Sequence, residues 1–191
     1  DGNPLYWLEK NFRRNEVNRI TGNASLKYDI IKDLYVKVSG NIYLYEAINE
    51  SFTKATQTYS QIFANPQVFN TTRPATWSQN RTVQQQYNAI INYTKRIGNN
   101  HNINAMLGAE TFGQKSLNSQ VSGSGAPTDA IPTVNASTIF NAGSNFSSKS
   151  EYRIISHFGR INYDYDQRYL LTLVYRADGI SSLANDNRWG F

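Results

Sequence analysis

The chain has 191 residues, of which 39% are hydrophobic and 13% aromatic, and this is enough for one ordinary domain. It contains no cysteine, which excludes a disulfide scaffold and thiolate metal or redox sites. The net charge is +5, but the basic residues are scattered along the chain, so we expect no nucleic-acid partner. No segment approaches the ~18–20 consecutive apolar residues of a membrane-spanning helix, which excludes a helical membrane protein.

The first predicted hairpin covers residues 18–45. Even-numbered positions from Ile20 to Ile30 are mostly apolar, and odd-numbered positions from Arg19 to Asp29 are polar. A turn near Lys32 leads to a second arm, one face of which carries Leu34, Val36, Val38, Gly40, Ile42 and Leu44. A strict period of two over about a dozen residues indicates a strand with one apolar and one polar face. Strands of globular proteins average only about five or six residues.

Two further hairpins are predicted over residues 82–112 and 151–178, with tight turns near Gly98 and Asp166. The second hairpin is less regular, because Ile90 and Met106 interrupt its polar face. Tyrosines gather beside the short turns, as expected of an aromatic girdle at a membrane–water boundary: Tyr28, Tyr93, Tyr163, Tyr165 and Tyr169.

Long polar connections, residues 46–80 and 113–150, join the three hairpins. Short turns at one end and long loops at the other are typical of bacterial outer-membrane barrels. We therefore predict an all-β fold: an antiparallel meander of about six long strands, forming a segment of a large transmembrane β-barrel with both connections external. Residues 122–127 are expected to be flexible. The loop aromatics best suited to stack on a ligand are Tyr59, Phe63, Phe69 and Trp77.

Residues suited to catalysis are scarce. His101 and His157 are far apart and lie on predicted strands, and neither has a metal-ligand spacing. The sequence contains no nucleophile elbow and no phosphate-binding glycine loop. We therefore predict a protein that is not an enzyme, with no catalytic residue, no metal and no cofactor.

The third hairpin and its tail contain the most specific motif. From Phe158 the sequence reads FGRINYDYDQRYLLT, and Arg176-Ala177-Asp178-Gly179 and Asp186-Asn187-Arg188-Trp189-Gly190 follow. These segments resemble the barrel of SusC-like (RagA-like) TonB-linked outer-membrane transporters of the Bacteroidetes. We expect the motif residues to serve strand ends and loops rather than to bind a ligand: Asp178, Gly179, Asp186, Asn187, Arg188, Trp189 and Gly190.

The resemblance implies more than a fold. The whole protein would lie in the lipid of the outer membrane as a multi-pass barrel and import oligosaccharide or peptide fragments. A SusD-like surface lipoprotein would cap it, and the TonB system would act on a plug domain that is absent from this chain. Barrels of this family have 22 strands, so the chain is expected to be a piece of a longer protein.

Two other hypotheses remain open. One is a soluble, secreted β-sandwich that binds carbohydrate or acts as an adhesin, although the strand lengths and the loop asymmetry argue against it. The other is an autonomous eight-stranded barrel, for which six strands are too few. The transporter hypothesis fails if the apolar face of the second strand is sealed in a self-contained core, at Leu34, Val36, Val38 and Ile42.

Overall fold

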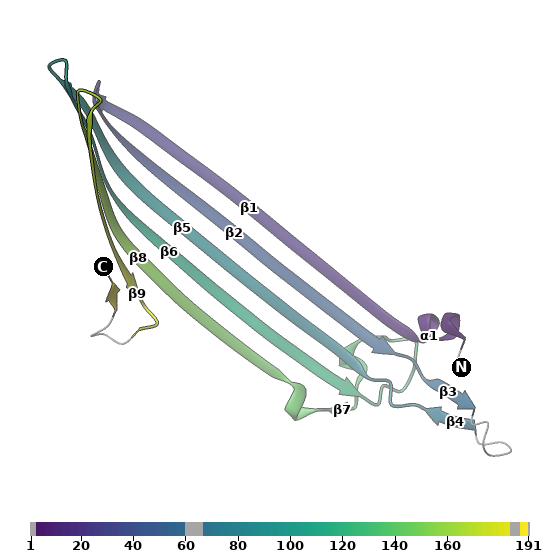
Figure 1. Cartoon of the computed structure of the whole chain (residues 1–191). Coiled ribbons are helices and arrows are strands. Elements are labelled where there is room, and N and C mark those ends of the chain that lie inside the picture. The colour runs from purple at the N-terminus through teal and green to yellow at the C-terminus, as the bar shows by residue number, and fades with distance from the viewer. Residues whose placement is uncertain (1–2, 60–66, 184–187, 191) are drawn as a thin grey trace. The chain divides into compact units, whose positions relative to one another are not determined.

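The computed structural model describes residues 3–59, 67–183 and 188–190 (Figure 1). Three short helical segments are present in these ranges: the α-helix α1 (Pro4–Lys10) and the 3₁₀ turns η1 (Val134–Ala136) and η2 (Ala142–Ser144). None of the described helices is long or apolar enough to cross a membrane. Most of the chain forms long strands: β1 (Asn11–Ile31), β2 (Leu34–Thr53), β5 (Ala75–Ile97), β6 (His101–Ser124), β8 (Phe146–Tyr165) and β9 (Tyr169–Ile180).

The long strands follow one another in the sheet in the order β1-β2-β5-β6-β8-β9. The short strand β10 (Trp189–Gly190) extends this order beside β9, and β7 (Ile139–Phe140) pairs with β6. Strands β3 (Thr56–Tyr59) and β4 (Gln67–Asn70) form a separate two-stranded sheet. Because every long strand pairs with its predecessor, the prediction of an all-β antiparallel meander is confirmed.

The long strands exceed their predicted bounds. β2 continues to Thr53 and β5 already begins at Ala75, so much of the predicted loop 46–80 is strand. Likewise β6 reaches Ser124 and β8 begins at Phe146, within the predicted loop 113–150. The added stretches are mostly polar, and apart from a few buried residues such as Phe52 and Ala75 they lack the regular alternation that marks a half-buried strand. Cross-strand polar pairs stabilise them instead, such as Gln79 Nε2 donating to Glu46 Oε1 at 2.8 Å.

The chain divides into two compact units. Unit 1 comprises residues 1–19, 45–82 and 116–149, and unit 2 comprises residues 20–44, 83–115 and 150–191. The three tight turns belong to unit 2 and lie where the sequence predicts them. Left-handed backbone closes two of them, at Gly98 (φ 60°) and at Asp166 and Gln167 (φ 53° and 55°). The two long connections, with β3, β4, β7, η1 and η2, belong to unit 1.

The strands of unit 2 have two distinct faces. The apolar face carries large side chains that no other part of the unit covers: Leu26 is 72% exposed, Leu107 62% and Leu173 55%. The opposite, polar face carries hydrogen-bonded side chains such as Gln86, Glu110 and Arg176. On β2, Val38 and Ile42 are 50% and 42% exposed, so they are not sealed in a core.

The buried core of unit 1 is small. Phe52, Ala75 and Ala126 are each at most 2% exposed, and Val134 and Ala136 pack against them. Residues 122–127 are therefore ordered, contrary to our prediction. Ser122 to Ser124 belong to β6, the Gly125 N–H donates to the Thr72 carbonyl at 2.6 Å, and Ala126 is in the core. The Gly-Ser composition predicted flexibility, but here small residues allow segments to approach closely: a Cβ at Gly123 would lie 2.7 Å from Ser137 Cβ.

Candidate functional site

An ion-pair network occupies the polar face of unit 2. Arg176 on β9 donates through Nε to Asp178 Oδ2 at 2.9 Å and also donates to Ser156 Oγ at 3.2 Å. Its guanidinium lies 3.9 Å from Glu110 Oε1 on β6, and Glu110 accepts from Gln86 on β5 at 2.8 Å. Four neighbouring strands are thereby linked through side chains. The network therefore places charged and hydrogen-bonding groups on the surface of the polar face of unit 2.

An apolar contact interrupts the polar face beside that network. The ring of Phe158 on β8 lies over Gly108 on β6, where a Cβ would come within 2.5 Å of ring carbons. Ile90 closes the same spot from β5, at 3.0 Å from the position of that Cβ. The Arg176 guanidinium lies 5.7 Å from the Phe158 ring centroid, within cation–π range. This packing accounts for the apolar Ile90 that breaks the polar pattern in the sequence.

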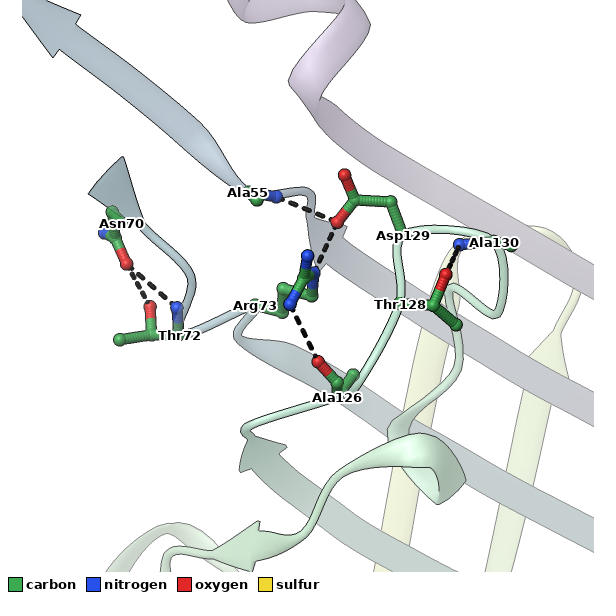
Figure 2. A network of polar contacts seen from close by, with 8 residues as sticks. All are labelled: Ala55, Asn70, Thr72, Arg73, Ala126, Thr128, Asp129 and Ala130. Atoms are coloured by element: carbon green, nitrogen blue, oxygen red, sulfur yellow. Dashed lines mark hydrogen bonds and ion pairs between the residues drawn. The ribbon is translucent and has the colours of Figure 1, made fainter. Parts of the chain in front are cut away.

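In unit 1, an arginine and a carboxylate join the two long connections. Asp129 Oδ1 accepts from Arg73 Nε at 2.5 Å and from the Ala55 N–H at 3.0 Å (Figure 2). The Arg73 guanidinium also donates to the Ala126 carbonyl at 3.1 Å. We call these four residues the loop clasp. It fastens the connection between β6 and β8 to the connection between β2 and β5, beside the core of unit 1.

The electrostatics of the clasp follow from these contacts. The hydrogen bond from the Ala55 N–H, together with the Arg73 guanidinium, holds the pKa of Asp129 below its ordinary value, because both favour the ionised carboxylate. The Arg73 side chain is only 17% exposed, so water weakens this pair less than a pair on an open surface. Arg73 itself has a left-handed backbone (φ 44°), which is uncommon for a non-glycine residue. No sequence pattern marked Asp129 as its partner.

The predicted ligand-stacking aromatics lie in different positions. Tyr59 ends β3, where it pairs with Gln67 of β4. Phe69 on β4 is 62% exposed, whereas Trp77 on β5 is half-buried. Phe63 lies outside the described residues. Of these four predicted aromatics, only Phe69 and Trp77 have described side chains, and Phe69 is the more exposed of the two.

The structure brings the two halves of the tail motif together. In the pairing of β9 with β10, Trp189 is opposite Gly179 and Gly190 is opposite Asp178. The Trp189 ring covers Gly179, where a Cβ would lie 3.0 Å from it, and stacks on His157 with centroids 6.0 Å apart. Arg188 donates to the Leu183 carbonyl at 3.2 Å. Asp186 and Asn187 lie outside the described residues.

Both histidines of the chain, His101 and His157, belong to unit 2. Within the described ranges, no group of histidine and carboxylate side chains is placed to hold a metal ion. His101 hydrogen-bonds through Nδ1 to the Tyr163 hydroxyl at 2.8 Å, and His157 stacks on Trp189. Both histidines thus pack against aromatic rings.

Parts of known proteins resemble this chain in sequence and in fold. The chain is 37% identical over 123 residues to the TonB-dependent receptor P26 of Formosa agariphila, a match that covers 60% of the chain and 11% of that receptor. It is 27% identical over 194 residues to the TonB-dependent receptor SusC of Bacteroides thetaiotaomicron, covering 98% of the chain and 17% of SusC. No family model matches. The structure of the RagAB peptide transporter aligns over 97% of the chain and 20% of its own chain, with a TM-score of 0.80 at 18% identity.

The resemblance to SusC/RagA-like TonB-dependent receptors is confirmed. The RagAB peptide importer in its "open-open" state gives a TM-score of 0.81 over the same share of the chain, so the fold is a segment of a large β-barrel like that of RagA. The chain spans less than a fifth of the length of the curated SusC-like and P26 receptors it matches. Sequence reasoning found the motif that carries the resemblance, but it missed the loop clasp and the Arg176 network, whose members are distant in sequence.

Proposed function

We propose that the chain is part of the wall of an outer-membrane TonB-dependent importer and has no enzymatic role. The observation that carries this proposal is the contrast between the two faces of unit 2. On β9, Leu173 has an exposed apolar side chain on one face, whereas Arg176, three residues further along, belongs to the hydrogen-bonded network on the other face. Lipid on one side and a water-filled or protein-filled lumen on the other require this contrast.

Two physical arguments support a lipid-facing surface. In water, a contiguous patch of exposed leucine, isoleucine and valine side chains larger than a few hundred Å² is rare and promotes association. In lipid, the same patch is stable, because the long strands satisfy their backbone groups by pairing with neighbours and no helix is needed. Aromatic side chains then gather near the short turns, where Tyr165 lies 6.3 Å from Tyr169 and 4.9 Å from His101 between ring centroids.

For the cargo, we propose glycan or peptide fragments, taken up together with a SusD-like surface lipoprotein. The RagAB structures are described as a peptide transporter and importer, and SusC is a TonB-dependent receptor. The TonB system would act through a plug domain elsewhere in the longer protein. The exposed ring of Phe69, with Tyr59 and Trp77, would stack on cargo at the external mouth.

The deciding experiment compares two adjacent residues of β9 in the full-length protein. Leu173 is on the apolar face and Val174 on the polar face, and they are 55% and 72% exposed. In an outer-membrane barrel, Leu173→Lys should cost about 2–4 kcal/mol of folding free energy in lipid vesicles, whereas Val174→Lys should be nearly neutral. In a water-soluble protein both substitutions would be tolerated. Equal tolerance, together with a monodisperse soluble protein, would favour the secreted sandwich and overturn the proposal.

The transport role needs its own test. Cells that depend on the full-length protein for uptake are supplied separately with fluorescent oligosaccharides and peptides, and Phe69→Ala is compared with Trp77→Ala. We expect loss of uptake of one cargo class when the gene is deleted, and a larger defect for the more exposed Phe69 than for Trp77. Normal uptake of both classes in the deletion strain would contradict an import function.

A further inference from the structure

An open groove of about 480 Å³ crosses the apolar face of unit 2. Its walls come mainly from β5, β6, β8 and β9, with Leu34 of β2 at one side, and include Ile91, Ala105, Leu107, Ile161, Leu173 and Tyr175. The volume is within the range of roughly 300–1,000 Å³ that is typical of small-molecule sites. Gly159 of β8 lies in this groove, between the exposed side chains of Leu107 and Ile161.

The backbone conformation at position 159 does not require a glycine. Its φ is not in the left-handed region, and a Cβ there would meet Met106 O at 3.4 Å and Leu107 Cδ1 at 3.6 Å, which are ordinary contacts. Gly108 and Gly179 differ, because an aromatic ring occupies the space of the missing side chain at each. Glycine weakens a strand interior and often marks a place where a ligand approaches closely. At Gly159 the empty space is on the surface, so we infer that the occupant comes from outside the chain.

The chemistry of the groove selects an apolar chain. A docked peptide or a second protein strand would bring N–H and C=O groups that need partners, and the walls are almost entirely hydrocarbon. A methylene chain has no such groups and gains about 0.8 kcal/mol per buried CH₂. The same face remains apolar around the groove, because Leu171 and Val38 are also half-exposed.

The position of the groove across the membrane also favours an acyl chain as its occupant. Tyr163, four residues along β8 from Gly159, hydrogen-bonds to His101 beside the short turns. Four residues of strand span about 13 Å. With a strand tilt of roughly 35–45°, the groove lies about 10 Å inside the tyrosine girdle, at the level of acyl chains and not of headgroups. Since short turns face the periplasm in such barrels, the adjacent leaflet is the inner one, which presents phospholipid.

We propose that the groove at Gly159 is a binding site for one acyl chain of a phospholipid in the periplasmic leaflet. This inference rests on the proposed membrane location. The site holds a chain in place, whereas the rest of the apolar face is in contact with exchanging lipid. Filling the groove should therefore release that lipid without disturbing the barrel.

The test uses the full-length protein in phosphatidylethanolamine vesicles containing a trace of phosphatidylethanolamine with a diazirine at mid-chain. After photolysis, mass spectrometry compares labelling of Leu107 and Ile161, which are 62% and 48% exposed, with labelling of Leu26 on the apolar face of β1, which is more open at 72%. We expect several-fold more labelling at the groove. Gly159→Leu should reduce the groove labelling to the Leu26 level, whereas the control Ala24→Leu, on the same face of β1, should not.

Each outcome bears on the proposal. Equal labelling of Leu107 and Leu26 in the unaltered protein, or groove labelling that persists in Gly159→Leu, overturns the lipid site but leaves the membrane assignment intact. Absence of labelling at all three positions overturns the membrane assignment itself. Gly159→Ala, whose Cβ fits the structure, replaces the leucine variant if the latter does not fold, and heat-modifiable migration on a gel reports folding. Cross-linking of Leu107 to a second copy in place of lipid also overturns the proposal.

Discussion

Arg73 and Asp129 are 56 positions apart in the sequence, yet Nε of the arginine donates to Oδ1 of the aspartate at 2.5 Å. Since the same oxygen accepts from the Ala55 N–H, one carboxylate holds two connections together. The connections of unit 1 are therefore expected to open together.

Replacing Asp129 with alanine should loosen both connections. The substitution removes the acceptor for Arg73 and for Ala55, and one lost hydrogen bond of this kind is worth about 1 kcal/mol, or roughly a fivefold change in local opening. Hydrogen exchange in the full-length protein should rise at Ala55 and across residues 125–133. Asp129→Asn keeps an oxygen for the Ala55 N–H and should fall in between. Faster exchange in only one connection would contradict a shared clasp.

The clasp should also respond to acid. Because the folded pKa of Asp129 is lowered, its stabilisation is fully present above the unfolded value of about 3.9 and is lost as the pH falls through the lower folded pKa. Exchange at Ala55, corrected for the intrinsic rate, should be flat from about pH 7 to 5 and rise only below about pH 4. The Asp129→Asn variant should show no such rise. A rise near neutral pH would mean that another group controls the loop.

The close contact between Phe158 and Gly108 predicts that a larger residue at position 108 lowers the stability of the protein. Gly108→Ala places a methyl group within 2.5 Å of the Phe158 ring, so the ring must move away from its position beneath Arg176. We expect a loss of about 1–3 kcal/mol in the free energy of unfolding, measured by urea titration in vesicles. The double variant Gly108→Ala/Phe158→Leu should recover part of the loss. If the two substitutions simply add, the clash is not the cause.

Gly125 and Gly143 allow a matched pair of glycine substitutions in unit 1. The φ of Gly125, +78°, is left-handed, and a Cβ would lie 2.5 Å from Thr138 Oγ1. Gly125→Ala should cost at least about 1–2 kcal/mol in local stability. Gly143→Ala should cost far less, because its Cβ would meet only Asn141 Oδ1, at 3.6 Å. Limited proteolysis within residues 122–144 should distinguish them, with cleavage accelerated in the first variant only.

The sequence predicts the strands of unit 2 well, because each half-exposed strand needs one apolar and one polar face. The alternation from Ile20 to Ile30 and the turn residues at Gly98 and Asp166 follow from this requirement. The helix α1 was missed, although Asn3 caps it through a hydrogen bond from the Leu5 N–H and Pro4 begins it, which is a recognisable start signal.

The parts that the sequence did not predict depend on contacts between distant residues. Where the alternation ends, near residues 46 and 113, the strands continue through pairs such as Glu46 and Gln79, whose polarity resembles that of a loop. The order of residues 122–127 depends on Phe52 and Ala75, far away in the chain. The loop clasp and the Arg176 network have the same origin, since charge pairs leave no periodic signal.

The indole of Trp189 rests on Gly179 because position 179 has no side chain. The two motifs, Asp178-Gly179 and Arg188-Trp189-Gly190, therefore form one packed unit although they are separate in the sequence. Positions 179 and 189 should therefore vary together among related sequences. Loss of the tryptophan removes the steric constraint on position 179, and a larger residue at position 179 requires a smaller side chain at position 189.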